Sequence, residues 1–167
     1  MNQSDLTALF DYNYWANARV LQAAAKVNAD SFVAPYPLSH GSLRGALVHI
    51  YGAEVVWRKR CQEGISLSAL PAEADLPTLE VLRERWQVEE QAMRAYLAAL
   101  SDDAVNGRVQ YKTTKGVPYE NVLWHLLAHV VNHGTQFRAE AAVALTDYGY
   151  SPGDLDLLLY WRERAAR

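Results

Sequence analysis

Three histidines, His125, His129 and His133, recur every four residues in the segment WHLLAHVVNHGTQF. Four residues are slightly more than one helical turn, so on a helix the three imidazoles would lie along one face. Two histidines at this spacing can offer two nitrogens to one metal ion, and they can equally bring two imidazoles to one substrate. Because the chain has only five histidines, this segment is the first candidate for a functional site.

The elements that would position these histidines are helices. Apolar residues recur at three and four along four long stretches, which is typical of amphipathic helices. Residues 107–117 alternate and then turn at Lys115 and Gly116, which predicts a short hairpin or an extended loop. The predicted helices cover about Ser4 to Lys26, Ser39 or Ser42 to Gln62, Thr78 to Ala99, Pro118 to Leu145, and a short final stretch from Leu155 to Arg164.

This pattern predicts one all-α domain over residues 1–167, a four-helix bundle with a hairpin-like loop before the fourth helix and a short C-terminal helix. Bundles build metal sites from side chains on facing helices. His49 of the second helix and two histidines of the fourth would supply three nitrogens and leave a coordination position open, as in catalytic metal sites.

Three neutral imidazoles suit zinc or nickel, or iron and manganese when water fills more positions. A histidine on a helix is nevertheless more often a hydrogen-bonded core or surface residue than a ligand, so the spacing alone leaves both interpretations open. We expect His40, in a loop, to be a capping or solvated residue, and His125 to be partly exposed.

Composition narrows the class of protein. The net charge is −3 and no basic stripe is present, which argues against nucleic-acid binding. A single cysteine, Cys61, excludes an intramolecular disulfide and fits a reducing compartment; we interpret it as a buried small hydrophobe rather than a nucleophile. The N-terminal residues do not read as a signal peptide, and no apolar run approaches the ~18 residues that cross a bilayer. A cytoplasmic protein without a membrane partner is therefore expected.

The chain resembles the DinB/YfiT-like family of metal-dependent bacterial proteins in four segments. These are DYNYWANARVL for the first helix, SLRGALVHIYGAEVVW for the second, VLWHLLAHVVNHGTQFRAEAAVAL for the fourth, and SPGDLDLLLYW for the C-terminal tail. The resemblance spans essentially the whole chain and implies a four-helix bundle, commonly dimeric, so a homodimer is expected. The family is associated with DNA-damage induction, but that association concerns expression, and the acidic composition still argues against DNA binding.

The resemblance also implies a ligand set. The family's metal is held by one histidine of the second helix and two on the fourth, which correspond here to His49, His133 and position 137. This chain has Phe137 where the family pattern HGTxHR has histidine. Either His129, one turn before His133, replaces the missing ligand, or the site binds metal weakly or not at all.

The helix geometry bears on this choice. Replacement by His129 requires His49 to lie about one turn, ~6 Å, further along the helix axis, which is large against a metal–nitrogen bond of ~2 Å. An altered site is therefore favoured over a simple exchange. The predicted ligands of a divalent metal are His49, His133 and His129.

Two functions follow from the resemblance. Relatives in the wider superfamily are similar to thiol-dependent transferases or isomerases that use a divalent cation and a low-molecular-weight thiol. By that analogy the chain is a metal-dependent enzyme of transferase or hydrolase type, whose small-molecule substrate lies among Tyr14, Trp15 and Trp57. Glu54 is a candidate partner of the ligands, and a solvent-facing or capping role fits it equally well. The alternative is a non-catalytic member with a degraded metal site that binds a ligand or a protein, and Phe137 favours it.

Overall fold

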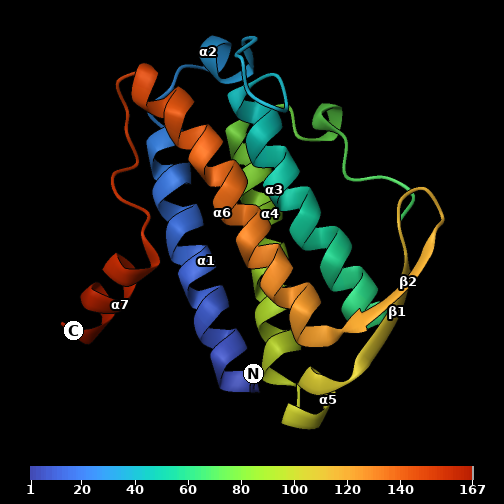
Figure 1. The fold of residues 1–167 in the computed structure, drawn as a ribbon. Coiled ribbons are helices and arrows are strands. Elements are labelled where there is room, and N and C mark those ends of the chain that lie inside the picture. Colours follow the sequence, from blue (N-terminus) through green and yellow to red (C-terminus); the bar gives the residue numbers. More distant parts are fainter. Residues whose placement is uncertain (167) are drawn as a thin grey trace.

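The computed structural model describes residues 1–166 as a bundle of four long helices with short additions at its ends (Figure 1). Helices α3 and α6 lie side by side along most of their length, and α1 packs against the opposite flank of α6. The predicted all-α bundle is confirmed. Its long helices are α1 (Gln3–Ala24), α3 (Leu43–Arg58), α4 (Leu79–Ala98) and α6 (Leu123–Asp147).

Side-chain caps fix where three of these helices begin. Helix α1 starts two residues earlier than expected for a Ser4 cap, because Asn2 and Asp5 form a capping box that satisfies two free backbone N–H groups. Ser42, one of the two predicted candidates, caps α3, and Thr78, the predicted start of the third helix, caps α4. The periodic pattern did not reveal three short helices, α2 (Ala29–Val33), η2 (Glu73–Asp75) and α5 (Asp102–Asn106).

The second predicted helix ends in an unusual turn. Helix α3 continues directly into a π-helix, η1 (Lys59–Glu63), whose last residue is followed by Gly64 with φ of +68°. A π-helix is rare and is frequently found at functional sites. It places Arg60 and Cys61 at the end of α3 beside the hairpin.

The predicted hairpin is present, but the fourth helix begins later than predicted. Strands β1 (Arg108–Lys112) and β2 (Pro118–Val122) are antiparallel, with Gly116 in the turn between them. Pro118 is therefore the first residue of β2, opposite Lys112, and not the first turn of a helix. A proline is tolerated at the start of an edge strand, where its missing N–H breaks no essential hydrogen bond. The helix α6 starts at Leu123.

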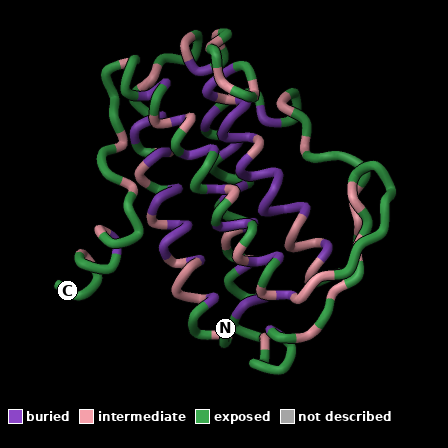
Figure 2. Tube along the Cα trace, in the orientation of Figure 1, coloured by how far each residue is buried: buried purple, intermediate pink, exposed green. Residues whose placement is uncertain are grey.

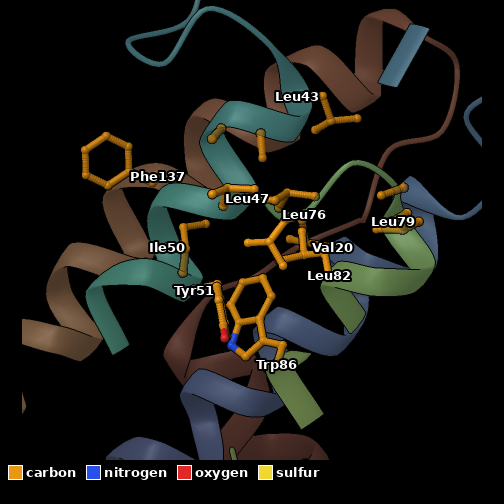
Figure 3. Close-up of a cluster of buried hydrophobic side chains, with 14 of the residues drawn as sticks. Val20, Leu43, Leu47, Ile50, Tyr51, Leu76, Leu79, Leu82, Trp86 and Phe137 are labelled. Atoms are coloured by element: carbon orange, nitrogen blue, oxygen red, sulfur yellow. The ribbon is translucent and has the colours of Figure 1, made fainter. Parts of the chain in front are cut away.

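The core runs along the inner faces of the four long helices, as the purple segments of Figure 2 show. One cluster of buried side chains lies between the C-terminal half of α1, α3 and α4, and includes Leu47, Ile50 and Trp86 (Figure 3). Phe137 of α6 lies at the rim of this cluster, set apart from its centre. A second cluster, around Phe10, Met93 and Leu127, fills the other end of the bundle.

The C-terminal helix α7 (Leu157–Ala165), capped by Asp156, lies outside the bundle next to α1. None of the helices over residues 1–166 is both long enough and apolar enough to cross a membrane.

Candidate metal centre

His49 and His133 meet between α3 and α6. The two Nε2 atoms are 3.0 Å apart, although the residues are separated by 84 positions in the sequence. Two metal–nitrogen bonds of about 2.0–2.1 Å, at angles between about 90° and tetrahedral, place their nitrogens roughly 2.9–3.4 Å apart. The observed distance therefore suits two ligands of one ion, and it equally suits a hydrogen bond between two neutral rings.

Both imidazoles are in the form that ligates a metal. Burial, and then the nearby His40, lower the pKa of His49 to about 4. Burial, and then His49, lower the pKa of His133 to about 4. Each ring is half-buried, so removal from water disfavours its cationic form. At neutral pH the pair is uncharged, so each ring has one unprotonated nitrogen that can ligate a metal ion.

Phe137 occupies the place next to this pair. Its ring centroid lies 4.4 Å from that of His49 and 4.6 Å from that of His133, and the residue is 8 % exposed. A phenyl ring offers no donor to a metal. It covers one side of both imidazoles and keeps water from that side.

His129 lies further from the pair. Its ring centroid is 5.7 Å from that of His133, and its ring stands edge-on to Trp57 at 5.3 Å. Over residues 1–166 there is no group of three or more His, Cys, Asp or Glu side chains arranged to hold a metal ion. The three-histidine ligand set therefore stays a prediction. The fourth-helix residue His125 is exposed and contacts Trp124.

Another histidine, His40, belongs to this site. Its ring stacks on His49 with centroids 3.7 Å apart and planes at 21°, and it also contacts Phe137 at 5.2 Å. The loop that carries it is fastened to α6, because Glu140 accepts hydrogen bonds from the Ser39 backbone N–H at 3.0 Å and from Oγ at 2.7 Å. From the sequence we predicted that His40 is a capping or solvated residue, because a loop residue belongs to no periodic pattern that would indicate its neighbours.

A buried polar network holds the helices behind the site. Glu54 accepts hydrogen bonds from the amides of Asn13 at 2.8 Å and Asn17 at 3.0 Å, and from the indole of Trp86 at 2.9 Å. Arg138 donates to the carbonyl oxygens of the same two asparagines at 2.6 and 2.8 Å. The carboxylate and the guanidinium are thus joined through two amides rather than in a direct ion pair. The network ties α1, α3, α4 and α6 together.

From the sequence, Glu54 was either a partner of the metal ligands or a solvent-facing or capping residue. It is 1 % exposed, and within the described chain its hydrogen bonds go to the network and to no histidine. Its role is to fix α3 against α1 and α4. The aromatic residues that were predicted to surround the substrate lie in different places. Trp57 contacts His129, whereas Trp15 packs on Tyr160 of α7.

The glycine that follows His133 is required by this network. A Cβ at Gly134 would lie 2.6 Å from Nη1 of Arg138 and 2.9 Å from Oδ1 of Asn13. Of the two consecutive residues, His133 is a candidate ligand and Gly134 allows α1 to approach α6 closely. This explains the glycine physically.

The fold is a four-helix bundle that carries a histidine pair between its second and last long helices. Comparison with known families identifies the family of this protein. Residues 1–166 match the model of the DinB family, and the chain belongs to that family. It is 24 % identical over 156 residues to the protein named Protein DinB of Bacillus subtilis (strain 168), a match that covers 91 % of each chain.

Proposed function

We propose that this DinB-family protein binds a divalent metal ion between α3 and α6 and uses it on a small-molecule substrate. The observation that supports the proposal is the approach of the His49 and His133 Nε2 atoms to 3.0 Å. Both rings are neutral at pH 7, and neutral imidazole suits zinc and nickel. The donor set fits two coordination positions, and the remaining positions are left for water or substrate.

A divalent ion in such a site lowers the pKa of a bound thiol or water, and we therefore propose a thiol transferase or hydrolase type of reaction. The chain's own residues do the positioning. The network around Glu54 and Arg138 fixes the register of α3 and α6, on which the contact between the two imidazoles depends. His40 and Phe137 shield the pair from water on the sides that they cover.

Metal content tests this proposal. The protein, His49→Ala, His133→Ala and the control His125→Ala are dialysed with zinc or nickel and analysed by mass spectrometry. We expect about one ion per chain in the wild type and in His125→Ala, whose histidine is exposed on the same helix, and loss of the ion in the other two variants. His129→Ala is the test of the third predicted ligand. A wild type that retains no ion, with a melting temperature indifferent to Zn²⁺ and Ni²⁺, would contradict the proposal.

A non-catalytic role is the second candidate, and Phe137 is the observation that favours it. Its ring contacts both imidazoles, and a hydrogen bond between His49 and His133 satisfies one nitrogen of each ring without a metal. In that case the protein keeps the bundle and binds a ligand or partner without turnover. A metal-free wild type that is as stable as the zinc-treated protein is the result that this role requires.

We also propose that the chain forms a homodimer. Leu158 and Trp161 of α7 and Val143 of α6 are exposed apolar residues that a second copy would cover. Tyr160, which lies between Leu158 and Trp161 on α7, is instead buried against Tyr12. Light scattering on the wild type and on Trp161→Ala measures the oligomeric state and its dependence on this surface.

A further inference from the structure

Arg60 is a buried cation without an anion beside it. It lies in the π-turn η1 and is 6 % exposed. Over residues 1–166 no hydrogen bond joins a side-chain nitrogen of Arg60 to the protein, and of these nitrogens only Nε is also fully enclosed by protein. The acidic residues nearest in sequence are engaged elsewhere, since Glu63 pairs with Arg58 and Lys59, and Glu54 accepts hydrogen bonds in the core network.

Two aromatic rings hold Arg60 in place. Its guanidinium carbon lies 4.6 Å from the centroid of Trp57 and 5.5 Å from that of Tyr111 on β1. Such cation–π contacts offset part of the cost of removing the charge from water. They leave the N–H donors in the guanidinium plane unpaired, and a guanidinium has five of them.

The neighbouring thiol does not compensate the charge. Burial raises the pKa of Cys61 to about 12, so the thiol beside Arg60 is uncharged at neutral pH. Burial also lowers the pKa of Arg60, and Tyr111 and Cys61 are the groups that oppose this shift; no carboxylate does so. The guanidinium nevertheless stays protonated, as arginines in proteins do.

The second buried arginine of the bundle shows what a structural role looks like. The Nε of Arg138 is enclosed and unpartnered, as in Arg60, but both of its Nη atoms donate hydrogen bonds, to Asn13, Asn17 and Thr135. Glu54 lies on the far side of the two asparagines. Buried charges are normally paired in this way, because it is costly to remove an unpaired charge from water. Arg60 departs from that rule, and such departures concentrate at functional sites.

The position of Arg60 links it to the histidine face of α6. The indole that it stacks on, Trp57, also contacts the exposed ring of His129 at 5.3 Å. Tyr111 closes the other side and stands edge-on to the same indole at 5.1 Å. An anion that reaches the guanidinium therefore lies in the corner between α3, α6 and β1.

We propose that Arg60 binds the anionic group, a carboxylate or a phosphate, of a small ligand in a subsite bordered by Trp57, Tyr111 and His129. The planar fork of arginine matches both oxyanions with two parallel hydrogen bonds. The subsite goes beyond the metal centre and does not require an ion at His49 and His133. All its measurements are made with chelator present, so failure of the metal proposal would not affect them.

The test follows the Nε–Hε resonance of Arg60 by ¹H–¹⁵N NMR of the full chain, assigned by its disappearance in Arg60→Lys. Inorganic phosphate and acetate are titrated separately at constant ionic strength, and the two series show which oxyanion the subsite prefers. We expect a saturable shift of this resonance with at least one of them. No shift up to about 50 mM of either anion, well above a millimolar Kd, would overturn the proposal.

Calorimetry with the preferred anion provides the matched comparison. Arg60→Gln is expected to lose about tenfold or more in affinity, the effect of a lost charge-assisted hydrogen-bonded pair. Arg85→Gln removes the same charge from an exposed position on α4 and is expected to bind as the wild type does. Equal losses in the two variants would show nonspecific charge screening and overturn the proposal.

Thermal unfolding separates binding from a structural role for Arg60. Without anion, Arg60→Gln should melt at or above the wild-type temperature, because an uncompensated buried charge has been removed. Should it instead melt well below the wild type, with Arg60→Lys restoring stability but the wild type showing no response to either anion, Arg60 only holds the hairpin and the subsite is refuted.

Discussion

Phe137 stands where the resemblance predicts a third histidine ligand. Its ring packs against both His49 and His133. The position was inferred from the resemblance, and the phenylalanine was read from the sequence. The physical consequence, a ring that shields the pair, could be seen only in the folded molecule.

Phe137→His is expected to raise zinc affinity by about tenfold or more, because a third nitrogen joins the two already 3.0 Å apart. Titration calorimetry with Zn²⁺ measures the change. Phe137→Leu is the control, since it opens similar space without a donor and should not gain affinity. Equal affinities of the histidine and leucine variants would show that the missing ligand is not what limits binding.

Cys61 is expected to be chemically inert. Burial raises the pKa of its thiol to about 12, so at pH 8 the reactive thiolate is about a thousandfold scarcer than at a thiol of ordinary pKa. Alkylation by iodoacetamide at pH 8, followed by mass spectrometry, should be slow in the native protein and fast in urea. Rapid modification of the native protein would contradict the interpretation of Cys61 as a packing residue.

At the scale of elements, periodicity predicted the four long helices and alternation predicted the hairpin. It failed where the local pattern is ambiguous, as at Pro118, which suits a first helical turn but is here an edge-strand residue opposite Lys112. The π-turn at the end of α3 and the stacking of His40 on His49 also depend on contacts between distant segments. No local pattern encodes such contacts.

Helix α6 depends on Gly134 for its approach to α1. Gly134→Ala is expected to destabilise the protein by about 2 kcal/mol, because the new Cβ would lie 2.6 Å from Nη1 of Arg138 and must displace it. Urea unfolding measures the loss. The control is Asn132→Ala, at an exposed position of the same helix, which should leave stability unchanged or slightly higher. A Gly134→Ala protein as stable as the control would show that the network relaxes without cost.

At the scale of the whole molecule, one polar network joins the four long helices through Glu54, Asn13, Asn17, Trp86 and Arg138. Little in the sequence predicted this network. Glu54 was considered only as a possible partner of the metal ligands, Arg138 was not singled out, and the partners of both lie on other helices. Only the tertiary packing brings them to a common point in the core.

The network makes stability depend on pH. Burial raises the pKa of Glu54, against the opposing effect of hydrogen bonds from Asn13, Trp86 and Asn17. Between the ordinary glutamate pKa, about 4.3, and the raised value, the folded chain holds a proton that the unfolded chain has released. The stability contributed by this group is therefore full below that window and is lost as the pH rises through the folded pKa.

Urea unfolding of the wild type and of Glu54→Gln across this pH range measures the contribution. The wild type should lose stability with rising pH relative to the variant, whose amide does not titrate but still offers an oxygen to Asn13 and Asn17. Parallel pH profiles would show that Glu54 titrates alike in both states.

The attachment of α7 has a practical consequence for handling this protein. The C-terminal segment is secured almost wholly to α1: the hydroxyl of Tyr12 donates to the Leu155 carbonyl at 3.0 Å, the Trp15 indole donates to Glu163 at 3.0 Å, and Arg19 pairs with Glu163 at 2.6 Å. Proteolytic clipping ahead of Leu155 would spare the four long helices yet uncover a strip of rings on α1. Protein cleaved at this point would stay folded but would tend to aggregate.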